Sequence, residues 1–195
     1  MATESTKVTT GKVRLSYVNL FQPRAINDSD PKYSVTLLIP KSDKETMRKL
    51  KAAEKLAIQR GIEQGKFTAA EANREGRLNS IIHDGDTYEK YDLEKNPEFA
   101  GHYVMSVNTD VNHRPGVVDR NLEPIMEASE VYSGCYARVA LTAFAYSASG
   151  NKGVSFGLNH VQKIADGDPL GGVSKVEDVF GEWDDDSDSD DDEFI

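Results

Sequence analysis

The residue types that carry out catalysis are scarce in this sequence and poorly spaced. Four histidines lie on four separate segments: His83, His102, His113 and His160. No two of them share the spacing of metal ligands, and the HDGD stretch at 83–86 has an Asp-Gly pair that is typical of a polar turn. The single cysteine, Cys135, lies at the start of a predicted strand and suits a buried structural thiol. We therefore predict no enzyme, no metal site and no cofactor.

Aromatic rings beside cations form a second pattern, which suits unpaired nucleic acid. Single-stranded DNA binds to rings on which bases stack, at about 1–3 kcal/mol per base, and to cations that follow the phosphates. The candidate DNA-binding residues are Arg14, Tyr17, Arg24, Lys32, Tyr33, Tyr88, Tyr91, His102, Tyr103, Arg114 and Lys152. Strand tyrosines such as Tyr17 and Tyr33 could equally fill a core, and single surface cations are often only solvated. Tyr88 and Tyr91 lie in a polar segment, which favours a stacking role.

The negative charge of the chain is concentrated at one end. The 195 residues carry a formal net charge of −10, with 33 acids and 23 bases. Residues 177–195 contain 11 of the acids and no Lys or Arg, which leaves 22 acids against the 23 bases in residues 1–176. The body is therefore nearly neutral and can offer cationic patches to a polyanion.

The sequence ends in WDDDSDSDDDEFI, an acidic run with an apolar tip. Its composition predicts a disordered tail over residues 177–195. A tethered polyanion competes with DNA for a cationic groove on its own domain, so we expect the tail to weaken DNA binding. Trp183, Phe194 and Ile195 could be buried by a partner protein and are the candidate partner-docking residues. A purely solubilising tail is the alternative.

Cysteine usage and hydropathy indicate the compartment. The lone Cys135 cannot form an internal disulfide and fits a reducing environment. The N-terminal stretch lacks the apolar region of a signal peptide, and no stretch approaches the roughly 18 apolar residues of a membrane span. We expect a soluble protein of the cytoplasm with no membrane partner.

Strands must position most of the candidate residues. Alternation of apolar and polar side chains predicts strands over 12–23, 32–40, 102–108, 115–119, 135–147 and 152–164. One helix is predicted over 42–61, with Ser42 and Glu45 as its capping box and Gly61 at its end. A short second helix is predicted over 68–76, and residues 83–100 form a long connection.

This element order favours a mainly β fold with some helix. We predict an OB-type five-stranded Greek-key barrel with a helical insertion between its second and third strands, and an α+β sandwich is the alternative. The predicted organisation is a disordered N-terminus at 1–10, one domain at 11–176 and the acidic disordered tail at 177–195.

Several stretches resemble a known family. They are RLSYVNLFQPRAI and PKYSVTLLIPKSD near the start, VNHRPGVVDRNLEPI, and SGCYARVALTAFAYSASGNKGVSFGLNHVQKIADGDPLGG. In this order they resemble single-stranded DNA-binding proteins of tailed phages and prophages, over about residues 12–172. The resemblance implies an OB-type fold, sequence-independent binding of single-stranded DNA in phage replication or recombination, and no catalytic activity or metal. The Phe-Ile end differs from the Pro-Phe or terminal Phe of similar tails, which leaves the docking partner open.

We therefore predict a single-stranded DNA-binding protein of the host-cell cytoplasm during phage growth. Its expected partners are single-stranded DNA and, through the tail, replication proteins such as a polymerase or helicase. Double-stranded DNA and RNA are weaker candidate ligands, and self-association is left open. The alternative function is a virion structural or scaffolding protein with no affinity for nucleic acid.

Overall fold

The computed structural model describes residues 5–171. Residues 1–4 and 172–195 lie outside this range. The predicted tail and its candidates Trp183, Phe194 and Ile195 therefore lie outside the described residues, as does the predicted domain end at residue 176. Within the described part, no helix is long and apolar enough to cross a membrane.

The described chain is mainly β with few helices, as predicted. The strands are β1 (Lys7–Thr9), β2 (Val13–Arg24), β3 (Lys32–Pro40), β4 (His83–Asp84), β5 (His102–Asp110), β6 (Gly116–Val118), β7 (Tyr136–Ala148) and β8 (Asn151–Ala165). The helices are α1 (Lys44–Glu63) and α2 (Ala69–Ala72), with single 3-10 turns at Pro97–Phe99 and Ala128–Glu130. Every predicted strand is present, with small shifts at its ends.

The predicted disorder of residues 1–10 is wrong for part of that stretch. Residues 7–9 form β1, which pairs antiparallel with an edge of β7. Val8 is buried, and Thr10 Oγ1 accepts a hydrogen bond from the Val139 N–H at 3.0 Å. A strand with a single apolar side chain shows no alternation in the sequence. β1 is ordered by its pairing with β7, which is distant in sequence.

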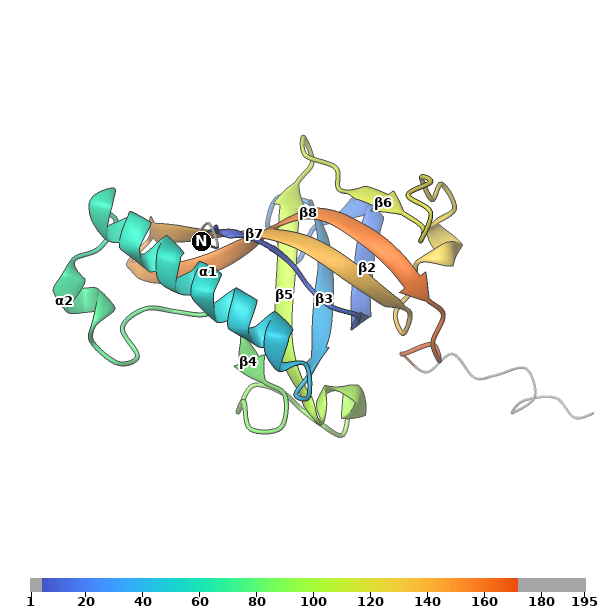
Figure 1. Ribbon diagram of the computed structural model, residues 1–195, viewed down its shortest axis with the longest axis horizontal. Coiled ribbons are helices and arrows are strands. Elements are labelled where there is room, and N and C mark those ends of the chain that lie inside the picture. Colours follow the sequence, from blue (N-terminus) through green and yellow to red (C-terminus); the bar gives the residue numbers. More distant parts are fainter. Residues whose placement is uncertain (1–4, 172–195) are drawn as a thin grey trace, which may run out of the picture.

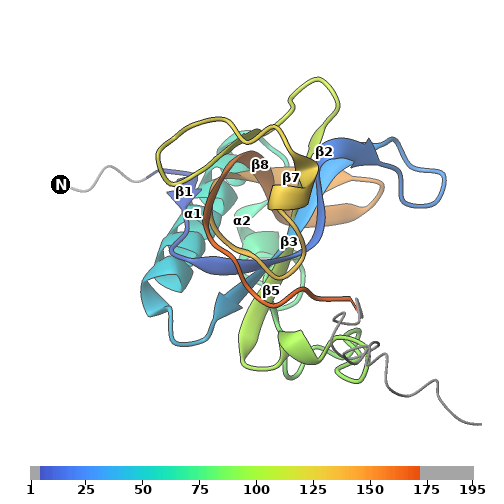
Figure 2. The same ribbon diagram turned by 90° about the vertical axis from the view of Figure 1, so that its right-hand side faces the viewer.

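Five strands pair so that the sheet closes on itself. β7 pairs with β2, β2 with β3, β3 with β5, β5 with β8, and β8 again with β7. The pairs within this ring are antiparallel except β5–β8. β1 and β6 extend it at β7 and β8 (Figure 1). In Figure 2 the loop between β2 and β3 projects away from the sheet, and α1 lies on the other side of the molecule.

The inner face of the ring is the hydrophobic core. Alternate residues of each strand point inward, since successive side chains of a strand face opposite sides. On β3 and β5 these inward residues are Tyr33, Val35, Leu37, Ile39, Tyr103, Met105 and Val107. The intervening residues point outward; Leu38 and Val104 are covered by Phe99 in a second, small hydrophobic cluster, and the polar ones line the surface.

Helix α1 follows β3 and begins two residues later than the predicted range of 42–61. Its N-cap is Asp43, whose carboxylate accepts hydrogen bonds from the Thr46 N–H at 3.1 Å and from Thr46 Oγ1 at 2.6 Å. The predicted capping box of Ser42 and Glu45 is therefore wrong. Glu45 instead pairs with Arg48 at 2.7 Å, since a helical turn brings these residues together.

Gly61 does not end α1, because the helix continues to Glu63. Gly61 is buried, and a Cβ at this position would lie 2.6 Å from Phe67 Cζ and 2.7 Å from Ala145 Cβ. The glycine therefore allows α1 to approach β7 closely. Leu50, Ala53 and Ala57 lie on the same buried face of α1.

Helix α2 is shorter than the predicted range of 68–76 and begins with a capping box: the Thr68 side chain accepts from the Glu71 N–H, and the Glu71 side chain accepts from the Thr68 N–H. The Glu71 carboxylate also holds Lys152 Nζ of β8 at 2.9 Å and Arg77 Nη2 at 3.2 Å. These contacts lower the pKa of Glu71 to about 2, with the Thr68 backbone hydrogen bond as the largest cause and Lys152 as the next. Glu71 thus ties α2 to the β7–β8 hairpin.

Candidate nucleic-acid interface

The outer faces of β2, β3 and β5 carry small polar side chains. Cross-strand register places Ser34 opposite Asn108 and Thr36 opposite Ser106. Thr36 Oγ1 and Ser106 Oγ lie 2.9 Å apart, and Asn19 Nδ2 of β2 donates to Ser34 Oγ at 3.4 Å. These five residues form the floor of a groove of about 680 Å³, which we call the main groove.

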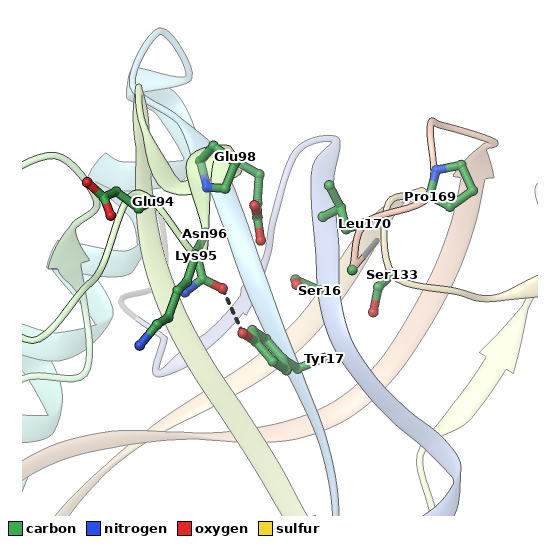
Figure 3. A pocket seen from close by; sticks show the side chains of 11 residues that line it. Ser16, Tyr17, Glu94, Lys95, Asn96, Glu98, Ser133, Pro169 and Leu170 are labelled. Atoms are coloured by element: carbon green, nitrogen blue, oxygen red, sulfur yellow. Dashed lines mark hydrogen bonds between the residues drawn. The ribbon is translucent and has the colours of Figure 1, made fainter. Parts of the chain in front are cut away.

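Tyr17 forms one wall of the main groove. It lies where the β2–β3 register shifts between Ser16 and Asn19, and its φ is 48°, in the left-handed region that bulky residues rarely adopt. Its side chain is 56% exposed, and its hydroxyl donates to Asn96 Oδ1 at 2.6 Å (Figure 3). Backbone strain of this kind often occurs at ligand sites. The strained turn holds the ring outside the core.

A chain of aromatic rings forms the opposite wall. Tyr91 packs edge to face on Phe99 at 4.9 Å between centroids and on Tyr88 at 4.8 Å, and His83 stacks on Tyr88 at 3.8 Å. Phe99 is buried and anchors the chain of rings in the fold. Burial raises the pKa of Tyr91 and lowers the pKa of His83, where Lys90 adds to the effect. Both rings are therefore neutral near pH 7, and this wall offers stacking surface without charge.

Cations lie at one end of the main groove. Arg24 lines the groove, and its register partner is Lys32 on β3. Both side chains are exposed, although Lys32 also lies opposite Asp110 of β5. The adjoining loop carries Ile26, which is 69% exposed and lines the same groove. A polyanion that enters here meets two cations and one apolar side chain.

Four of the predicted site residues make hydrogen bonds, an ion pair or core contacts within the protein. Arg14 donates to the carbonyl oxygens of Gly134 at 3.1 Å and Asp168 at 2.6 Å. Lys152 is paired with Glu71. Tyr33 points into the core at 9% exposure, and Tyr103 also packs on the core. These contacts argue for structural roles.

The remaining candidates lie in three places. Tyr17, Arg24 and Tyr91 line the main groove, with Lys32 beside it and Tyr88 behind Tyr91. His102 lies at the start of β5, where its Nδ1 is 2.8 Å from the Ala100 carbonyl oxygen. Arg114 lies beyond the end of β5 and lines a different groove.

The sequence reasoning missed the groove floor. The outward positions of the strand at 32–40 were visible as polar residues alternating with apolar ones, and Ser34 and Thr36 are two of them. Their partners on β5 could have been found by the same alternation. Asn96 and Phe99 had no such signal, since their segment has no regular period.

A second hollow adjoins the main groove on the far side of Tyr17. Its volume is about 640 Å³, and Tyr17 and Asn96 line both hollows. Figure 3 shows the hydrogen bond between these two side chains. Glu94 and Glu98 line it together with Lys95, whose Nζ is already paired with Asp92 at 3.4 Å. These carboxylates would repel phosphates, so the main groove is the better candidate for nucleic acid.

The described residues offer binding groups more readily than reactive ones. Within residues 5–171, no cluster of three or more His, Cys, Asp and Glu side chains could hold a metal ion. Cys135 is buried, and that burial raises the pKa of its thiol, which lowers its reactivity. The arrangement can stack bases, hydrogen-bond their edges and attract phosphates.

Comparisons with known proteins find relatives along almost the whole chain. A family model described as the single-stranded DNA-binding protein of Enterobacter phage Enc34 matches residues 6–194. Putative protein p50 of Acyrthosiphon pisum secondary endosymbiont phage 1 is 33% identical, over 97% of this chain and 98% of its own.

Two similar solved structures are of the single-stranded DNA-binding protein from bacteriophage Enc34. The C-terminal truncation is 25% identical with a TM-score of 0.66, over 85% of this chain and 88% of that chain. The complex with single-stranded DNA is 28% identical with a TM-score of 0.61, over 85% of this chain and 90% of that chain.

Proposed function

Because the chain belongs to the family of the single-stranded DNA-binding protein of Enterobacter phage Enc34, we propose that it binds single-stranded DNA in the main groove. The observation that carries the proposal is the composition of that groove. It has a polar floor between Tyr17 and Tyr91, with Arg24 at one end. Rings, small polar groups and a cation are the three components that unpaired strands require.

Each part of the groove has a distinct task. Bases stack on Tyr17 and Tyr91, at about 1–3 kcal/mol per base. Every base has a π-face, so this contact is tolerant of sequence. The short side chains of the floor let the strand approach the sheet, and Arg24 and Lys32 contact phosphates at the end where they lie. The strand order of the ring supports an OB-type arrangement, in which this outer face is a common nucleic-acid surface.

The biological role that we propose is protection of phage DNA during replication or recombination in the host cytoplasm. In this proposal the acidic residues 177–195 compete for the main groove, and Trp183, Phe194 and Ile195 dock replication proteins. The charge distribution supports the competition. The position of the last described residues supports it too, since Leu170 packs against the cluster of Leu38, Phe99 and Val104 and lines the hollow next to Tyr17.

Fluorescence anisotropy with labelled single-stranded DNA, duplex DNA and RNA tests the proposal. We expect the tightest binding to single-stranded DNA, with an affinity that falls as salt rises, because each neutralised phosphate adds about −0.7 to the log–log slope. Lys32→Ala should reduce this slope, whereas Lys55→Ala on the exposed face of α1 is the matched control. Absence of any affinity for single-stranded DNA, together with ordered self-assembly, would instead support a virion structural protein.

A further inference from the structure

A row of outward-facing residues crosses six strands of the sheet. Each residue is the register partner of the next: Asn19 (β2), Ser34 (β3), Asn108 (β5), Gly157 (β8), Thr142 (β7) and Lys7 (β1). All six are polar or small, and register partners lie on the same face of a sheet. With neighbouring strands about 4.8 Å apart, the row is roughly 24 Å long. We call it the polar row.

The far half of the polar row lies in a second groove, on the outer face of β8, β7 and β1. This groove has a volume of about 670 Å³, similar to that of the main groove. Its floor is low, since Gly157 has no side chain and Ala140 has a methyl group. Asn159 Nδ2 donates to Thr142 Oγ1 at 2.8 Å, which fixes both polar side chains.

The second groove attracts anions. Lys7, Arg114, His113 and His160 line it, and no carboxylate is among its lining residues. The ion pairs within residues 5–171 do not involve Lys7 or Arg114. The nearby Asp110 pairs with His113 at 2.9 Å. Two unpaired cations therefore stand on the rim for a polyanion.

An exposed aromatic ring lies beside the same row. Phe144 of β7 is 46% exposed. Its neighbours Ala143 and Ala145 are buried, so Phe144 lies on the outer face of the strand. Its Cε1 atom is 3.9 Å from the point that a Cβ of Gly157 would occupy. The ring is therefore placed to stack a base at the edge of the polar row.

We propose that single-stranded DNA leaves the main groove across the Asn108–Gly157 pair and continues into the second groove. This inference rests on the proposed function. The two grooves meet at that pair, since Asn108 lines the main groove and Gly157 lines the second. Lys7 and Arg114 bind phosphates of the continued strand, and Phe144 stacks one of its bases. The binding site is thus divided into two parts that fill in turn as the strand lengthens.

Strand length separates the two parts in an experiment. The full chain is titrated with oligothymidylates of about 6 and about 16 nucleotides, the range that single domains of this type cover. The double variant Lys7→Ala/Arg114→Ala should reduce the magnitude of the log–log salt slope for the long strand by about 1.4, which is about 0.7 for each lost phosphate contact. The slope for the short strand should not change. Phe144→Ala should weaken only the long strand, by about fivefold or more.

Gly157→Val is a second, steric variant. Its Cβ would meet neighbours at 3.8 Å or more, so the strand should accept it, and its branched side chain would block the row and weaken the long strand only. Lys55→Ala is the control for charge, and thermal unfolding checks each fold. Unchanged long-strand binding in the double variant and in Gly157→Val would overturn the proposal, as would equal losses for both lengths. A wild-type protein that bound neither strand would refute the proposed function itself.

Discussion

The strained backbone of Tyr17 gives a prediction in which stability and DNA binding respond differently. Alanine is normally more stable than glycine inside a strand by about 0.5–1 kcal/mol, because glycine has more freedom to lose on folding. At a φ of 48° the left-handed conformation costs a residue with a Cβ roughly 1–2 kcal/mol, and costs glycine almost nothing. We therefore expect the usual order to reverse. Tyr17→Gly should be more stable than Tyr17→Ala by about 0.75 kcal/mol, the difference between the midpoints of these two ranges.

Both variants lose the ring and the hydrogen bond to Asn96, so these losses cancel in the comparison. Urea unfolding gives the difference as a shift in midpoint at constant slope. Both variants should also lose one stacking platform, and DNA affinity should fall by about 1–3 kcal/mol in each. Tyr17→Phe, which retains the ring, should bind DNA nearly as well as the wild type.

Two results would refute this reasoning. If Tyr17→Ala were the more stable variant, the residue would not occupy the left-handed region. If Tyr17→Ala bound DNA like the wild type while remaining folded by circular dichroism, the ring would not belong to the binding site.

Three further predictions concern the tail, the opposite wall and pH. Deletion of residues 177–195 should tighten binding of single-stranded DNA, most clearly at low salt, and an unchanged anisotropy titration would contradict competition by the tail. Tyr91→Ala should weaken binding by about 1 kcal/mol or more, with Tyr91→Phe as the control, and equal affinity of all three proteins would remove that ring from the site. Glu71 has its pKa lowered from 4.5 to about 2 by the Thr68 backbone hydrogen bond and by Lys152, so its stabilising effect is complete above pH 4.5 and is lost as pH falls towards 2. Thermal unfolding across that range should show a smaller pH dependence in Glu71→Gln, and identical profiles would disprove this role.

Much of the fold was predictable because it depends on local pattern. Alternation along 32–40 and 135–147 identifies two ring strands, since every second residue of each lies in the core. The same signal failed for residues 7–9, which contain one buried apolar residue and form a strand because they pair with β7. The family was also predicted, and the match over residues 6–194 confirms it.

The site was less predictable because it depends on register between distant segments. Arg14 and Lys152 are residue types that often contact phosphates. In the fold, however, Arg14 donates to the Asp168 carbonyl oxygen and Lys152 to the Glu71 carboxylate. No local pattern reveals such pairings. Tyr17 was ambiguous for a related reason, since its alternation predicts an inward ring and the irregular β2–β3 register turns it outward.

The closure of the ring has a consequence for its dynamics. β5 and β8 join through a single register pair, Asn108 opposite Gly157, whereas β7 and β8 are paired along their whole length. Segments held by few backbone hydrogen bonds open at low free energy and exchange their amide protons quickly. A nucleic acid laid across that junction would hold both of its sides. Amide exchange in β5 and β8 near the junction should therefore slow in the complex. The bound strand would then stabilise the most weakly paired junction of the ring.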